Sequence, residues 1–214
     1  MQIPGTLTQT RNNSALLSRR TLLGLGVAGM AAAVLPRGAF AALDNTQASA
    51  LISQAVADVN AAIASGKAGP ALYAQFEALF NKYADVPTIA RSALGSAARQ
   101  ASPAQIQGFT SAFRGYLARK YGKRFNEFRG AKFEVQGARQ VKTFYEVATT
   151  AHLPGKEPFN VQWQVSDKSG KNLFFNIIVE GVNMLASERT EIGAMLDQQK
   201  GDIDALIAAL KTAG

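Results

Sequence analysis

The sequence predicts an α+β fold: N-terminal helices pack on a curved antiparallel sheet of about four strands, and C-terminal helices follow. Three observations predict this fold. Apolar residues recur at helical spacing before Gly130, alternate with polar residues between Lys132 and Val179, and return to helical spacing from Ile192 onward. No repeat or linker interrupts this order, so one folded domain is expected.

The first 41 residues differ in composition from this domain. A polar segment ends in Arg19-Arg20, an apolar stretch runs from Leu22 to Leu35, and Ala39-Phe40-Ala41 offers a small-residue cleavage site. This is the three-part layout of a secretory signal, and the paired arginines favour the twin-arginine route over the general one. We therefore expect a cleavable signal peptide at 1–41 and a single domain at 42–214 that works in the periplasm.

Helical spacing marks three short helices and a long one ahead of the sheet. Apolar residues step by three or four from Ile52 to Ile63 and from Leu72 to Tyr83, and a third helix after Asp85-Val86-Pro87 has Ile89, Ala93 and Leu94 as its apolar residues. The long helix starts at Ser102-Pro103-Ala104-Gln105, a capping box with proline in its first turn, and its apolar stripe runs from Ile106 to Phe128. After the sheet, two more helices are expected, the second behind an Asp202 N-cap.

Strict alternation identifies the strands. In Phe159–Val165, FNVQWQV, the apolar residues fall on one face and the polar residues on the other. Asp167-Lys168-Ser169-Gly170 has turn composition and should join the last two strands as a hairpin. The four expected strands are Lys132–Val141, Phe144–His152, Pro158–Asp167 and Leu173–Val179.

Residues for catalysis and metal binding are scarce. The chain has one histidine, His152, and no cysteine, so a nucleophile–histidine site and a zinc site both lack their usual members. We expect no metal, no cofactor and no enzymatic activity. A pocket enzyme of the isomerase or hydrolase kind is the alternative, with a strand carboxylate of Glu134, Glu146 or Glu180 as its base.

Basic residues are concentrated at the end of the long helix. Residues 1–41 hold four arginines and no acid, so the rest of the chain has 19 basic and 15 acidic residues, a net charge of +4. Between Arg114 and Lys132 lie seven basic residues against Glu127 alone. Such a face favours anionic lipid head groups or an acidic partner. Nucleic acid is not expected as a ligand outside the cytoplasm.

Several motifs resemble those of the periplasmic phospholipid carriers of the MlaC type, also called the toluene-tolerance family. The similar segments are Tyr83-Ala-Asp-Val-Pro-Thr-Ile-Ala-Arg-Ser-Ala-Leu-Gly95, the long helix from Ser102, the strand Val161-Gln-Trp163, and Val179-Glu-Gly-Val182. Three asparagines depart from the family pattern, which often has tryptophan, aspartate and serine at these places: Asn172, Asn176 and Asn183.

The resemblance implies an apolar cavity enclosed between helices and sheet, which holds acyl chains and leaves the head group at its mouth. It also implies shuttling of phospholipid between an outer-membrane lipoprotein complex and an inner-membrane ABC transporter complex, which maintains outer-membrane lipid asymmetry. The residues expected to bind lipid are Phe76, Phe80, Tyr83, Val86, Ile89, Phe109, Phe113, Tyr116, Phe133, Phe144, Val147, Val161, Trp163, Phe175, Ile177 and Val182. The residues expected to contact a head group or partner are Arg91, Arg119, Lys120, Lys123 and Arg124.

Two other possibilities stay open beside the phospholipid carrier and the pocket enzyme. The departures from the family pattern leave room for a related branch that is associated with hopanoids, whose ligand would be a rigid polycyclic lipid. An adaptor or structural subunit with a solid core would show no cavity behind Trp163.

Overall fold

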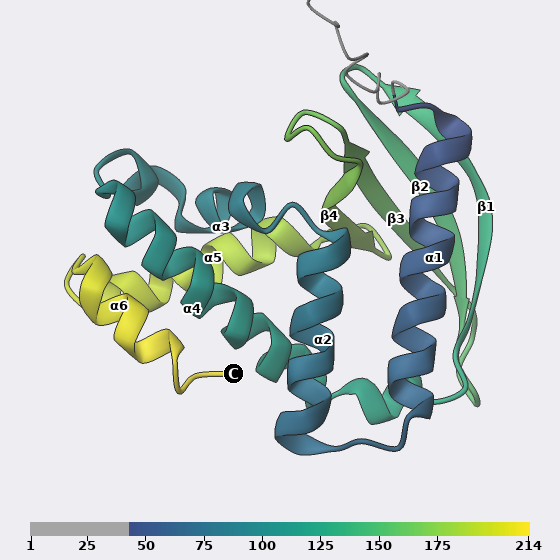
Figure 1. The fold of residues 1–214 in the computed structure, drawn as a ribbon, viewed down its shortest axis with the longest axis horizontal. Coiled ribbons are helices and arrows are strands. Elements are labelled where there is room, and N and C mark those ends of the chain that lie inside the picture. Colours follow the sequence, from purple (N-terminus) through teal and green to yellow (C-terminus); the bar gives the residue numbers. More distant parts are fainter. Residues whose placement is uncertain (1–42) are drawn as a thin grey trace, which may run out of the picture. The chain divides into compact units, whose positions relative to one another are not determined.

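The α+β architecture expected from the sequence is present in the computed structural model, which describes residues 43–214 apart from the side chains of residues 125 and 126 (Figure 1). The predicted signal peptide at 1–41 lies outside the described residues. Among residues 43–214, none of the helices combines the length and the apolar character that crossing a bilayer requires.

The helices begin where the sequence provides caps. Ser102 and Gln105 form the predicted capping box at the start of α4, and the Asp202 carboxylate accepts from two backbone amides of α6. The helical elements are α1 Asn45–Ala64, α2 Gly69–Tyr83, α3 Val86–Leu94, η1 Gly95–Arg99, α4 Pro103–Gly122, η2 Phe125–Phe128, α5 Met184–Gln198 and α6 Ile203–Leu210.

The sheet is an antiparallel meander in sequence order. Its strands are β1 Lys132–Val141, β2 Phe144–His152, β3 Phe159–Ser166, β4 Leu173–Val179 and β5 Val182–Asn183. The expected hairpin turn closes with a hydrogen bond from the Gly170 amide to the Asp167 carbonyl, 2.8 Å long. The expectation of about four strands missed β5, because two residues are too short to show alternation.

The strand register gives the sheet one apolar face, which we call the Trp163 face. Direct partners in an antiparallel pair lie on the same face, so Trp163 shares its face with Val147 of β2 and Ile177 of β4. Along β1 to β4, the apolar residues of this face are Phe133, Val135, Ala138, Tyr145, Val147, Ala151, Phe159, Val161, Trp163, Val165, Phe174, Ile177 and Val179.

The opposite face of the sheet carries a row of hydrogen-bonded polar side chains, which we call the polar ladder. The Arg139 guanidinium donates to Glu146 at 2.6 Å, the Gln164 amide donates to Glu146 at 3.3 Å, and the Asn176 amide donates to Gln164 at 3.0 Å. These contacts cross four strands. The Asn176 side-chain oxygen also accepts from the Leu185 amide at 3.1 Å, so the polar ladder reaches the start of α5.

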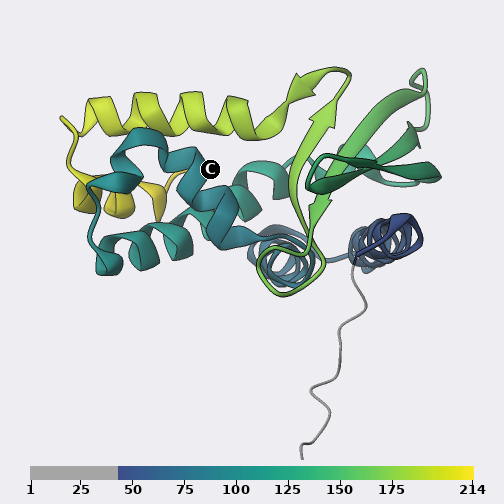
Figure 2. The ribbon, with the colours of Figure 1, turned by 90° about the horizontal axis from the view of Figure 1, so that it is seen from above.

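The helices divide into two groups around the sheet (Figure 2). α1 packs on β1 and β2, while α3, α4, α5 and α6 pack on one another beside β4 (Figures 1 and 2). α2 contacts both α1 and α4 and connects the two groups. The long helix α4 therefore lies among α2, α3 and α6, although three of its residues, Phe109, Phe113 and Tyr116, were expected to bind lipid in a cavity between helices and sheet.

The apolar interior consists of three clusters. The main cluster joins α1, α3, α4, α5 and α6 to the sheet around Val147, Val165 and Phe174. The α1–α2 cluster has Ala62, Ile63, Leu72 and Phe76 at its centre. The strand-end cluster has Ala131, Ala151, Leu153 and Val161.

Candidate functional site

The three apolar clusters meet at side chains that are only partly buried. Leu79 borders the main and α1–α2 clusters, Phe128 borders the α1–α2 and strand-end clusters, and Trp163 and Ile177 border the main and strand-end clusters. Partly buried apolar side chains keep surface that a ligand can cover. The zone around these four residues, which we call the meeting zone, is therefore the candidate site for an apolar ligand.

The Trp163 indole is held in place by a buried threonine. Its Nε1–H donates to Thr149 Oγ1 at 3.1 Å, and the Thr149 hydroxyl donates to the Val161 carbonyl at 3.0 Å. Thr149 is 1% exposed and lies on the Trp163 face. An edge contact with Phe174, 5.4 Å between ring centroids, fixes the other side of the indole.

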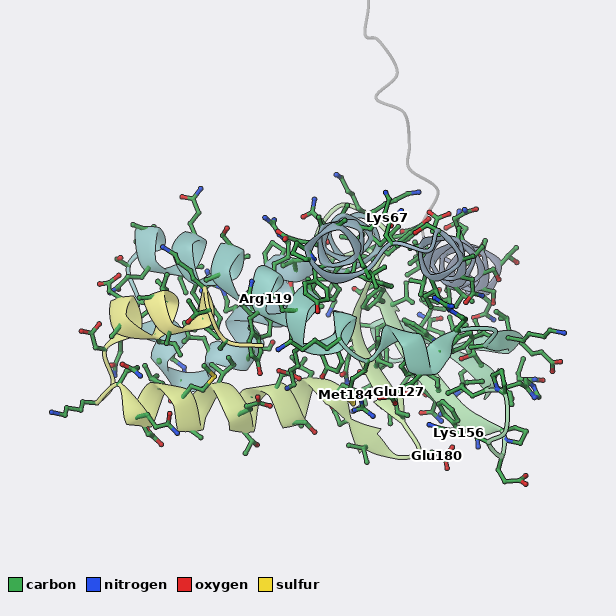
Figure 3. The ribbon with its side chains drawn as sticks, turned by 90° about the horizontal axis from the view of Figure 1, so that it is seen from below. Lys67, Arg119, Glu127, Lys156, Glu180 and Met184 are labelled. Atoms are coloured by element: carbon green, nitrogen blue, oxygen red, sulfur yellow. The ribbon has the colours of Figure 1, made fainter. Side chains whose placement is uncertain are left out.

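Charged groups of both signs border the strand-end cluster. Figure 3 labels Glu127, Lys156 and Glu180, which come from η2, the β2–β3 link and the β4–β5 turn. The hydrogen bond from Arg124 and the nearby charge of Lys156 lower the pKa of Glu127. Both charge signs are thus present where the apolar zone reaches the surface.

The predicted lipid-binding residues fall into separate places. On the Trp163 face lie Phe133, Val147, Val161, Trp163 and Ile177. Val182 pairs with Val179 at the end of this face and is 54% exposed. Phe76 belongs to the α1–α2 cluster. Packed in the main cluster are Phe80, Tyr83, Val86, Ile89, Phe109, Phe113 and Tyr116.

Phe144 and Phe175 do not share the face of Trp163. Phe144 lies two residues before Glu146 and therefore on the polar face of β2. The register shifts at Gln164 and Val165, which leaves Phe175 as an extra residue of β4, and its ring contacts Phe144 at 5.5 Å. These two of the residues expected to bind lipid therefore lie away from Trp163.

The aromatic residues of α4 pack within the helical group. The Phe109 and Phe113 rings stack at 5.4 Å, and both side chains are almost completely buried. Tyr116 continues this stack, and its hydroxyl donates to Glu191 at 2.5 Å. Burial and this carboxylate raise the pKa of Tyr116.

Four of the five residues that were predicted to contact a head group or partner bind other groups of this chain. Arg119 (Figure 3) donates to the carbonyls of Leu210 and Ala213, at 2.5 and 2.8 Å. Lys123 donates to the Gly214 carbonyl, and Arg124 pairs with Glu127 at 3.3 Å. Lys120 pairs with Glu188 and Glu191 at 2.7 and 2.5 Å.

The Lys120 pairs belong to a buried polar cluster between α4 and α5. Glu188 is 4% exposed and accepts from Lys120 and from the Tyr121 hydroxyl. Burial and the Glu188 charge raise the pKa of Tyr121. Burial alone would lower the pKa of Lys120, but the carboxylates of Glu188 and Glu191 outweigh it and raise that pKa. The ion pairs of Lys120 therefore connect the end of α4 to α5.

The fifth predicted contact, Arg91, lines a surface cleft of about 820 Å³ between α3, η1 and α4. A second cleft, of about 400 Å³, lies between α2, α4 and α6. Neither cleft is lined by residues of the Trp163 face.

The departures at Asn176 and Asn183 have structural roles. Asn176 joins the polar ladder to α5, and the Asn183 side chain caps α5 by accepting from the Ala186 amide at 3.0 Å. Asn172 donates to Gln47 of α1 at 3.5 Å.

The candidate groups for catalysis are spread out. Glu146 is paired with Arg139 on the polar face, Glu180 accepts from the Asn160 amide, and His152 Nε2 lies 3.7 Å from Glu134. Within residues 43–214, no group of three histidine, cysteine, aspartate or glutamate side chains could hold a metal ion.

The site includes residues that the sequence did not select. Leu79, Phe128, Thr149 and Val179 all border or anchor the meeting zone. Thr149 lies two residues after Val147, and Val179 lies two residues after Ile177. Because residues two apart in a strand share a face, this spacing could have identified both residues. No local signal distinguished Leu79 from the other apolar residues of α2.

Comparisons with known proteins agree with this arrangement. A solved structure of a phospholipid-binding protein from Ralstonia solanacearum, in complex with a phospholipid, matches with a TM-score of 0.62 and 22% sequence identity over 76% of this chain and 94% of that one. At this identity the match establishes the shared fold. The family model described as "MlaC protein" matches residues 51–212, which is most of the sequence. The chain therefore belongs to the MlaC family.

Proposed function

We propose that this protein is a periplasmic carrier that holds phospholipid acyl chains against the Trp163 face. The observation that carries the proposal is the meeting zone, where Leu79, Phe128, Trp163 and Ile177 stay partly exposed between three apolar clusters. Family membership supports the proposal, as does the phospholipid bound to the Ralstonia solanacearum protein of the same fold.

The energetics of transfer require such a surface. Each methylene that is exposed to water costs about 0.8 kcal/mol, so a single sixteen-carbon chain costs roughly 12 kcal/mol to move through an aqueous compartment. A carrier offsets this cost with apolar contact area and needs no catalytic group. The side chains of the Trp163 face provide that area, because their polar neighbours point to the opposite side of the sheet.

The head group would lie at the strand-end border. Lys156 and Glu127 stand close enough for the lysine charge to affect the carboxylate, and Glu180 follows Val179, which packs against the strand-end cluster. A border of mixed sign suits a head group that carries a phosphate and an amine, because each finds an opposite charge.

The carrier would move phospholipid between an outer-membrane lipoprotein complex and an inner-membrane ABC transporter complex, and so maintain outer-membrane lipid asymmetry. A signal peptide at 1–41, with its Arg19-Arg20 pair, would deliver the protein to the periplasm.

Native mass spectrometry and lipid extraction of the purified protein test the binding. The wild-type protein is expected to carry phospholipid. Trp163→Asp should reduce the bound fraction by about tenfold or more, because it puts a charge against the acyl chains. Gln162→Asp is the matched control, since Gln162 is the next residue of β3, is exposed and points to the polar face.

Two results would overturn the proposal. One is a wild-type protein that carries no lipid and takes up none from phospholipid vesicles. The other is equal lipid loss in Trp163→Asp and Gln162→Asp while both variants keep the wild-type circular dichroism spectrum. Extraction of a hopanoid in place of phospholipid would identify the polycyclic ligand as the cargo.

A further inference from the structure

One long stretch of the helical group contains basic residues and no acidic residue. From Val86 to Asn126 there is no aspartate or glutamate, and there are seven basic residues. Five of these have recorded partners: Arg114 with Glu77, Arg119 and Lys123 with backbone carbonyls, Lys120 with two glutamates, and Arg124 with Glu127. Stabilisation within the chain accounts for these five charges.

The remaining two basic residues, Arg91 and Arg99, lie together. Within the described part of the chain, neither guanidinium has a recorded hydrogen bond or ion pair, and both side chains are exposed. Both line the cleft of about 820 Å³ between α3, η1 and α4, and Arg114 stands in the same lining. Within Val86–Asn126, the two charges without a partner in the described chain are thus gathered in one concave place.

The chemistry of this cleft fits a peptide with carboxylates. Ala98, Ala101 and Ile106 give it an apolar part, and Gln107 and Ser111 of α4 add polar side chains. Arginine binds carboxylates in a planar two-point geometry that lysine does not match. A recess between helices admits a protruding chain segment, whereas a flat bilayer surface reaches only its edges.

We propose that this arginine cleft is a docking site for an acidic segment of a partner protein. Charge complementarity between the segment and Arg91 and Arg99 would speed its association and select it from neutral segments. The cleft is separate from the Trp163 face, so docking and lipid binding use different surfaces. A carrier built this way can engage a partner while its cargo site stays occupied.

Fluorescence anisotropy with a defined probe tests the docking site. The probe is a short fluorescein-labelled peptide rich in glutamate and alanine, with a second peptide in which glutamine replaces every glutamate. The double variant Arg91→Glu/Arg99→Glu should bind the acidic peptide about tenfold or more weakly than the wild type. Lys67→Glu/Lys171→Glu makes the same change of net charge at exposed lysines outside the cleft, and should change the affinity less than about threefold.

Amide chemical shifts of the isotope-labelled protein identify the binding surface. Addition of the acidic peptide should move signals of α3, η1 and the first half of α4, and the glutamine peptide should not. The proposal is overturned if the acidic peptide does not bind, if both double variants lose affinity equally, or if the shifts map elsewhere. It is also overturned if Arg91 and Arg99 are needed only for binding anionic phospholipid vesicles.

Lipid occupancy separates this proposal from the carrier function. Native mass spectrometry of Arg91→Glu/Arg99→Glu should show the same bound lipid as the wild type. Loss of peptide binding with lipid retained supports the docking site. A wild-type protein without lipid but with peptide binding through the cleft would contradict the carrier function alone.

Discussion

The Trp163 Nε1–H donates a hydrogen bond to the Oγ1 atom of Thr149 at 3.1 Å, across the β2–β3 pair. Thr149 in turn donates to the Val161 carbonyl. This link sets the orientation of the largest side chain on the Trp163 face. Since Trp163 is the one tryptophan in the sequence, its fluorescence reports on this part of the interior.

Thr149→Val is expected to destabilise the fold by about 1–3 kcal/mol, because valine keeps the shape of threonine but removes the acceptor of the indole N–H. Urea unfolding followed by tryptophan emission measures this loss. Thr150→Val is the control, since Thr150 lies on the polar face and its hydroxyl accepts from the exposed Gln136 at 3.3 Å. Equal losses in the two variants would show that the indole hydrogen bond does not contribute.

The alternation of apolar and polar residues predicted the strand bounds well. The bounds of β1, β2 and β4 agree with those expected, and β3 is one residue shorter at each end. Alternation predicts which residues share a face only while the register holds. The irregularity at Gln164 and Val165 gave β4 an extra residue, and Phe175 consequently moved away from Trp163.

The contacts of the long helix could not be predicted in the same way. Helical spacing identifies the buried stripe of α4 but not the element that covers it. Lys120 meets Glu188, 68 residues later, and Lys123 meets Gly214, 91 residues later. The cluster of positive charge therefore suggested a binding face, although three of its seven members, Arg119, Lys120 and Lys123, contact α5 or the C-terminal residues.

Lys120→Met should destabilise the protein by about 3 kcal/mol, because it leaves the buried Glu188 carboxylate without its counter-ion. Chemical unfolding measures the loss. Arg124→Met removes an exposed ion pair with Glu127 and should leave the unfolding midpoint nearly unchanged. If the two variants had the same stability, the polar cluster between α4 and α5 would not be what stabilises the end of α4.

Asp58 should make stability depend on pH in the acid range. The hydrogen bond from Lys82, followed by that from Tyr83, lowers the pKa of Asp58 from 3.8 to about 2. A lowered folded pKa means that the contribution is complete above about pH 4 and is lost as the pH falls through 2. Thermal unfolding between pH 2 and 5 should therefore show a steeper loss for the wild type than for Asp58→Asn.

Asp197→Asn is the control for this pH dependence, since Asp197 is exposed on α5. Its unfolding temperature should follow the wild-type curve. If Asp58→Asn also follows the wild-type curve, the charge of the Asp58 carboxylate is not needed for the contacts that Lys82 and Tyr83 of α2 make with α1.

Gly122, the last residue of α4, lies directly against the Tyr73 ring of α2. A Cβ atom at this residue would lie 2.4 Å from Cδ1 of Tyr73, far inside van der Waals contact. Gly122→Ala should therefore destabilise the protein by about 1–3 kcal/mol, although alanine is the better helix former. Chemical unfolding measures the change, and Tyr73→Ala combined with Gly122→Ala should recover part of it.

Gly193→Ala separates the effect of this close approach from helix propensity. Gly193 lies within α5, and a Cβ atom there would meet nothing within 4 Å. Alanine should stabilise the protein at this position by roughly 0.5–1 kcal/mol. Opposite signs for the two substitutions would establish that Tyr73 requires a glycine at the end of α4. A stabilising Gly122→Ala would instead mean that Tyr73 can move aside at little cost, and that α2 and α4 are not fixed by this contact.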